Sequence, residues 1–545
     1  MLIRKKPPRS HALGEPLLHE NHPLPVTRRD FVAAGFLSGP AMVIGPAWLA
    51  GLLKASRANA ALSADIQALL GTGQCNVPTA SGGLPFICFD LAGGANLVGS
   101  EVLVGVQGGQ RNFLSTAGYG KLGLPGNMVP SSSANIDASL GLLWHADGAI
   151  KRGILSKATT PATAAGTNGA VLCAMSQNDT QNNPHNPMYG IAKAGAQGLL
   201  LTLIGTESSA SGGNSQAPMA LIDPSLQPTT INQPSDATAL VDTGGATADP
   251  VAVAVLESQA RISGGNTAQA GAGDTAAFTG TLSMPNGATP GVQLYGSDPN
   301  ATAVMDAALK NQVRCAYVKS ANTADAFGNP AALDPTKDPN IIGGATPIFT
   351  ASDFSDSDVQ KTATVMKLVL NGYAGAGTIT LGGYDYHDGT RATGEDRNFK
   401  AGQMIGAVLE YAHRVGKPVM VYVFSDGSLT STGMVDNSAG GRGKLGWQGD
   451  NASVASTFFL AYSPAGRPQP RNGAAGQQIG YFSSDGSVVS TSSPAANAVN
   501  QLVQVVILNY MGLMGTDGQF PTLFPMQSLG SGSALAGLTA FTRIV

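Results

Sequence analysis

Charged residues are scarce, making up only 12% of the 545 positions, which is about half the usual share. The net charge of −3 is unevenly spread, because residues 1–60 carry eight basic and three acidic residues, a balance of +5. The remaining residues include 23 basic and 31 acidic ones, a balance of −8. A mildly acidic chain without a basic stripe repels phosphate backbones, so we do not expect nucleic acid as a partner.

Cysteine is also rare, and none of the four cysteines has the C-x-x-C spacing of a metal or redox motif. On proximity alone, Cys75 and Cys88 are the best candidates for a disulfide in an oxidising compartment. The alternative is that Cys88 and Cys173, each inside an apolar run, are buried free thiols. The sequence leaves both interpretations open, and it disfavours a cysteine-based metal site.

Several catalytic signatures are missing. There is no G-x-S-x-G elbow, so an ordinary serine α/β-hydrolase would lack its nucleophile, and there is no P-loop and no H-E-x-x-H motif. Two G-x-G-x-x-G matches, at 118–123 and 441–446, do not lead from a predicted strand into a predicted helix. We therefore expect no dinucleotide cofactor.

Long apolar runs are absent after residue 60, so we expect no membrane span in that part of the chain. Within residues 1–60, Arg28 and Arg29 precede Phe31, and an uncharged stretch then extends to residue 53. Small residues at 58–60 end the segment. This order is typical of a twin-arginine signal peptide, and the glycines and prolines of the uncharged stretch make an uncleaved anchor the weaker alternative. Residues 1–60 are thus predicted to be a leader for the twin-arginine export machinery, with a periplasmic or secreted protein following.

The remaining chain predicts an α/β fold. Continuous apolar runs that end abruptly in small or polar residues are typical of strands buried on both faces of a parallel sheet. Helical patterns with start and stop signals lie between and after them. We predict one domain over 61–545 with a largely parallel central sheet, helices on both faces, and a loop-rich insertion over 205–300. The predicted strands are 85–91, 170–175, 198–204, 378–381 and 418–424, and the predicted helices are 301–319, 357–371, 395–415 and 496–511.

Polar residues follow two of these strands. Strand 378–381, helix 395–415 and strand 418–424 form a βαβ unit, so both strands should end at the edge where α/β sheets bind ligands. Asp385 and His387 follow the first strand two positions apart, and on an extended segment they point the same way. Asp426 follows the second strand. We expect the two strands to be neighbours in the sheet, which would place Asp426 beside Asp385 and His387. A carboxylate pair with an imidazole is a plausible ligand set for zinc or a similar divalent ion; an ordinary polar turn is the alternative.

Four histidines remain after residue 60. His185 lies in a polar loop after strand 170–175 and is expected to complete the metal site, although a surface loop position is equally open. His145 is predicted to be structural, and His413 to be a solvated residue at a helix end.

Four segments follow one another in a characteristic order: Phe89–Asn96 with its Gly-Gly turn, His185, Gly382–His387 and Ser425–Gly427. This order resembles a family of exported bacterial proteins of uncharacterised function that carry twin-arginine leaders. That family belongs to the alkaline-phosphatase-like superfamily of phosphatases and sulfatases. The resemblance spans most of residues 85–460. It implies an alkaline-phosphatase-like fold and metal-dependent hydrolysis of phosphate or sulfate esters, with a small ester as substrate.

Two departures from that family weaken the predicted site. Ala95 stands where an aspartate is usual, and residues 443–451 lack the histidine of an Asp-His-Gly element. The sequence therefore supports one half of a two-metal site, and only Ser208 and Ser209 are candidates by position for a nucleophile. A non-catalytic exported protein for binding or envelope assembly, on the same scaffold, is the alternative function.

Overall fold

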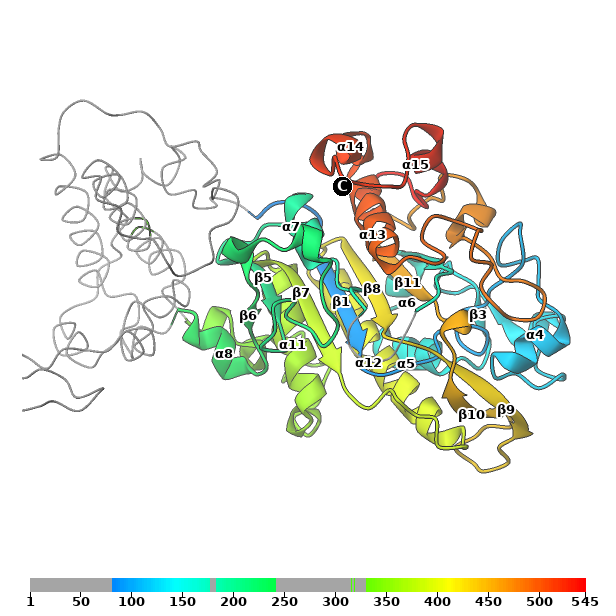
Figure 1. Ribbon diagram of the computed structural model, residues 1–545. Coiled ribbons are helices and arrows are strands. Elements are labelled where there is room, and N and C mark those ends of the chain that lie inside the picture. The colour runs from blue at the N-terminus through cyan, green and yellow to red at the C-terminus, as the bar shows by residue number, and fades with distance from the viewer. Residues whose placement is uncertain (1–80, 177–182, 242–314, 316–317, 319–329) are drawn as a thin grey trace, which may run out of the picture. The chain divides into compact units, whose positions relative to one another are not determined.

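The computed structural model describes residues 81–176, 183–241, 315, 318 and 330–545 (Figure 1). The predicted leader, most of the predicted insertion and most of the predicted helix 301–319 lie outside the described residues. All structural statements below concern the described part of the chain.

An eight-stranded sheet forms the centre, in the order β12–β4–β11–β8–β1–β7–β5–β6 (Figure 1). All of these strands run in one direction except β11, which is antiparallel to both of its neighbours. The predicted α/β class with a largely parallel sheet is confirmed. The strands are β1 Phe86–Leu91, β4 Thr167–Leu172, β5 Leu201–Gly205, β6 Thr229–Thr230, β7 Ala374–Leu381, β8 Val419–Ser425, β11 Thr457–Tyr462 and β12 Gln478–Ile479.

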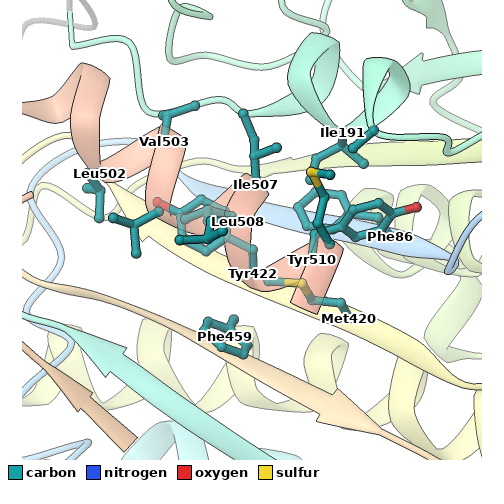
Figure 2. Packing of buried hydrophobic residues seen from close by; sticks show 14 of the residues in the cluster. Phe86, Ile191, Met420, Tyr422, Phe459, Leu502, Val503, Ile507, Leu508 and Tyr510 are labelled. Atoms are coloured by element: carbon teal, nitrogen blue, oxygen red, sulfur yellow. The ribbon is translucent and has the colours of Figure 1, made fainter. Parts of the chain in front are cut away.

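One face of the sheet is covered by α7 (Met188–Lys193) and α13 (Val499–Met514). The sequence of α13 is apolar almost all round, which is typical of a helix buried on most sides. Figure 2 shows Leu508 of this helix near Tyr422 of β8, and Tyr510 beside Phe86 of β1, with ring centroids 5.9 Å apart. The Tyr510 hydroxyl also donates to the carbonyl of Leu84 at 2.9 Å, which ties the helix to the start of β1.

The other face is covered by α11 (Ser357–Leu370) and α12 (Ala392–Arg414), with α5 (Ala149–Lys157) packed on α12. Glycines allow α5 and α12 to approach closely. A Cβ atom on Gly402 of α12 would lie 2.0 Å from the carbonyl oxygen of Ile150, and one on Gly153 of α5 would lie 2.1 Å from that of Phe399. The two helices therefore cross with backbone against backbone.

Smaller elements surround this core. A hairpin of β9 (Leu429–Val435) and β10 (Leu445–Asp450) follows β8 and projects from the sheet (Figure 1). None of the described helices is both long enough and apolar enough to cross a membrane. The remaining elements are α4 Thr116–Lys121, α6 Pro161–Ala165, α8 Pro234–Ala239, α14 Phe520–Leu523, α15 Ser533–Gly537, and a short pair of β2 Ile136–Asp137 with β3 Trp144–His145.

The sheet order differs from the prediction at one important place. β7 and β8 are parallel and end at the same edge, as the βαβ unit requires, but β1 lies between them and pairs with both. The expectation that β7 and β8 are direct neighbours is therefore wrong. The crossover through α12 passes over β1, which enters the sheet from a distant part of the sequence.

The cysteines resolve one open question. Cys88 and Cys173 are buried free thiols, so the pairing of Cys75 with Cys88 is wrong. Cys315 is disulfide-bonded.

Candidate metal site and a buried carboxyl pair

Asp385 and His387 lie on the exposed side of the segment that leaves β7. The segment is extended, so its side chains alternate: Tyr384 and Tyr386 are buried, whereas Asp385 and His387 face solvent. Nε2 of His387 lies 2.9 Å from Oδ1 of Asp385. Carboxylate and imidazole thus converge at the carboxyl edge of the sheet.

Asp450 completes a three-residue group with them. It is the last residue of β10, and its carboxylate and the ligand atoms of Asp385 and His387 all lie within 4.8 Å of one another. All three residues are exposed. Two carboxylates and one imidazole are suitable ligands for zinc or another borderline divalent ion, so this group could hold a metal.

The Gly-Gly turn after β1 lies against both halves of this group. A Cβ atom on Gly93, whose φ is +128°, would lie 2.4 Å from the amide nitrogen of Asp385. A Cβ on Gly94 would lie 3.4 Å from Oδ1 of Asp450. Glycine at 93 therefore lets the β1 turn pack directly on the backbone that carries the ligands.

Tyr386 anchors the ligand segment from the inside. Its hydroxyl accepts a hydrogen bond from the amide of Asn96 at 3.0 Å and donates to Oδ1 of Asn398 at 3.0 Å. Asn96 follows the Gly-Gly turn, and Asn398 lies in α12. The residue between the two ligands is thus fixed to two other elements, which restricts the orientation of Asp385 and His387.

A buried ion network fixes the hairpin that carries Asp450. Nζ of Lys444, at the base of the hairpin, lies 2.7 Å from Oε1 of Glu395 in α12. Arg391 donates from Nε to the same carboxylate at 3.0 Å and stacks over the ring of Trp447, 4.4 Å from its centroid. These groups are almost completely buried, and their opposite charges offset the cost of removing them from water.

Asp426 does not join the metal group. It directly follows β8 and is fully buried. Its neighbour Ser425 is in register with Leu91, and Phe424 is in register with Asp90. Because side chains alternate along a strand, Asp426 is directed to the face shared by Phe424 and Asp90, under α7 and α13.

Asp426 forms a buried carboxyl pair with Asp90 instead. The Ser215 hydroxyl lies 2.9 Å from Oδ1 of Asp426 and 3.2 Å from Oδ1 of Asp90, and the Ser215 amide donates to Oδ2 of Asp90 at 2.7 Å. Burial raises the pKa of Asp90 from 3.8 to about 7; the Ser215 hydrogen bonds oppose this shift and the charge on Asp426 adds to it. Asp90 therefore holds its proton to near neutral pH.

His185 lies next to this pair and outside the metal group. Its Nε2 is 3.2 Å from Oγ of Ser176, which donates to the backbone carbonyl of Asp426. The His185 ring stacks on Phe424 with a centroid separation of 5.7 Å. Burial lowers the pKa of His185 to about 3, so the ring is neutral at physiological pH.

The other predicted residues lie elsewhere. Ser208 is exposed, and Ser209 donates to the carbonyl of Gly213 at 2.7 Å. His145 is buried, where its Nε2 lies 3.0 Å from the Met128 carbonyl and burial lowers its pKa to about 4. His413 lies in the last turn of α12 with Nδ1 2.9 Å from the hydroxyl of Tyr462.

Sequence reasoning missed Asp450, Asp90 and Ser215 as site residues. Asp90 is the penultimate residue of a predicted strand, a position that points to the ligand edge. Asp450 and Ser215 stand in loop-rich sequence, where no local pattern marks them. Asp450 and Ser215 are brought to the sheet edge only by packing between segments that are far apart in the sequence.

Comparisons with known proteins give no further information. No family model matches the chain, and neither the curated proteins nor the solved structures contain a match.

Proposed function

We propose that this chain is an exported, metal-dependent hydrolase of phosphate or sulfate esters. The observation that carries the proposal is the convergence of Asp385, His387 and Asp450 at the carboxyl edge of a parallel sheet. Ligand sites in open α/β sheets lie at this edge. The proposed ligand set keeps Asp385 and His387 from the sequence prediction, and Asp450 takes the place of Asp426 and His185.

The residues around the group have separate tasks in this proposal. A divalent ion, when bound, polarises an ester oxygen and activates a nucleophile. Asp385, His387 and Asp450 would hold the ion, while Tyr386 and the Gly93 turn keep these three side chains in place. Because the three ligands are exposed, the reacting group of an ester can reach them from solvent without any movement of the fold.

Export remains part of the proposal and derives from residues 28–60. The disulfide-bonded Cys315 supports it, since structural disulfides persist in oxidising compartments. The alkaline-phosphatase-like assignment likewise derives from the ordered motifs, and the largely parallel sheet is consistent with it.

A second function, binding without catalysis, is favoured by one observation. Neither Ser208 nor Ser209 contributes to the metal group, and His185 and Asp426 lie in a separate buried cluster. An exported protein that binds a metal or an anion on this scaffold would need no nucleophile.

One experiment separates these functions. The full chain is expressed in its native host, recovered from the periplasm or medium, and analysed for metals. It is then assayed with para-nitrophenyl phosphate and sulfate after addition of zinc, manganese or magnesium. We expect stoichiometric metal and hydrolysis, both lost in an Asp385→Asn, His387→Ala double variant.

The matched control is Asp396→Asn, which removes an exposed carboxylate of α12 outside the group. It should keep both metal and activity. Bound metal without hydrolysis of either ester would favour the binding function, and recovery of the protein only from the cytoplasm would contradict export. If the wild-type protein contains no metal as recovered and binds none after metal is added, the metal proposal is wrong.

A further inference from the structure

A half-buried arginine lies beside the loop that carries the metal ligands. Arg397 belongs to α12, and its guanidinium is stacked on Gly383, two residues before Asp385. A Cβ atom at position 383 would lie 3.0 Å from Cζ and 3.1 Å from Nη2 of Arg397. A side chain at position 383 would press on this guanidinium, and φ of +84° at Gly383 independently favours glycine.

The Arg397 guanidinium makes no hydrogen bond and no ion pair with any residue that the structure describes. Asp358, an acidic residue of α11, is paired with Lys400 at 2.5 Å. A guanidinium that lies flat on a backbone keeps its N–H edge available in the plane of the group. That edge matches the oxygens of a phosphate or sulfate in a bidentate arrangement.

A second cation lies at the end of the same strand. Nζ of Lys361, from α11, donates to the carbonyl of Thr380 at 3.4 Å and forms no ion pair within the described part of the chain. Nothing among the described residues comes within 4 Å of the position that a Cβ would take on Gly382. The amides of Gly382 and Gly383 donate to no described carbonyl. Two cations and two amides without a described carbonyl acceptor therefore lie along residues 380–383.

We propose that Arg397, Lys361 and the Gly382–Gly383 turn form a binding site for a tetrahedral oxyanion next to the metal group. The inference rests on the proposed function, because the anion would be the phosphoryl or sulfuryl group of the ester. The stacked arginine sets the orientation of the group through a forked pair of hydrogen bonds, and the lysine adds charge. In a chain with so few charged residues, two cations that form no ion pair with a described residue and lie at the end of one strand are a specific feature.

The test measures anion binding to the full chain by titration calorimetry with inorganic phosphate and, separately, inorganic sulfate. Each titration is made with EDTA-treated protein and with zinc-supplemented protein. We expect Arg397→Gln to weaken the affinity for the anion about tenfold or more in both conditions, because the substitution removes a charge-assisted hydrogen bond. Arg397→Lys should recover part of the loss, since it keeps the charge without the fork.

Arg111→Gln is the matched control, because Arg111 is exposed and lies in a different loop. It should leave the affinity unchanged, and circular dichroism should show that each variant is folded. Lys361→Gln offers a second variant, with an expected smaller loss. The anion bound more tightly by wild type names the ester class.

The outcomes separate this inference from the proposed function. Binding that depends on Arg397 in EDTA-treated protein supports the oxyanion site even if the chain hydrolyses nothing. Metal-dependent hydrolysis with an unchanged anion affinity in Arg397→Gln overturns the oxyanion site alone. Failure of wild type to bind either anion, with or without zinc, also overturns it.

Discussion

At the scale of single residues, Asp90 and Asp426 place two carboxyl groups around one serine hydroxyl in the protein interior. Such a pair is costly when both members are ionised, because burial disfavours charge and the like charges repel. Folding therefore raises the pKa of Asp90 from 3.8 to about 7. Between these values the folded chain holds a proton that the unfolded chain has released.

Stability of the metal-free protein should consequently fall as pH rises from about 4 to about 7, by up to about 4 kcal/mol from Asp90. Asp90→Asn should remove this part of the pH dependence. The asparagine oxygen can accept from the Ser215 amide, and its NH₂ can donate to the Ser215 hydroxyl, so the substitution preserves the hydrogen bonds. Urea unfolding with EDTA at a series of pH values measures the effect.

Asp396→Asn serves as the control for this series and should give the wild-type profile. If Asp90→Asn and wild type lose the same stability between pH 4 and pH 7, the buried pair does not behave as described.

The residue scale also shows what the sequence could predict of the site. Asp385 and His387 could be placed together, because alternate residues of an extended segment share a side. The sequence also predicted correctly that Asp426 lies at the carboxyl edge of the sheet. It did not predict that the Asp426 side chain points inward, towards Asp90, because the direction of that side chain depends on where the strand ends. Asp450 could not be found, because its position depends on how a distant hairpin packs on the Gly94 turn.

At the scale of elements, α5 and α12 cross with their backbones in direct contact. Gly402→Ala would place a methyl group 2.0 Å from the Ile150 carbonyl, so the helices must separate. We expect a loss of about 1–3 kcal/mol in the free energy of unfolding, typical of overpacking.

Gly120→Ala in α4 is the matched control, because nothing lies within 4 Å of the added methyl group. This substitution should be neutral or slightly stabilising. Chemical denaturation of the two variants measures the difference, and equal stabilities would contradict the close crossing.

Elements were predictable where their sequence pattern is local. The five predicted apolar runs correspond to β1, β4, β5, β7 and β8, and three predicted helices correspond to α11, α12 and α13. β11 was missed, and so was the insertion of β1 between β7 and β8. Strand order depends on which distant segments pair, and buried strands of similar composition carry no local signal for it.

At the scale of the whole molecule, the metal group joins segments that are far apart in the sequence. Asp385 and His387 extend from the β7 loop, Asp450 ends the projecting hairpin, and the β1 turn lies between them. An ion bound to all three would hold the hairpin to the sheet and would bind the folded state only. Its binding free energy would then add to the stability of the fold.

Zinc or manganese should therefore raise the thermal midpoint of EDTA-treated protein in a concentration-dependent way. At a free metal concentration of about 100 times Kd, the added stability should be about 2.7 kcal/mol. Asp450→Asn should abolish most of this shift while leaving the metal-free midpoint close to that of wild type, because Asp450 is exposed. Asp396→Asn should keep the full shift. A metal-induced shift that survives Asp450→Asn would place the ion elsewhere, and the hairpin would then have no part in the site.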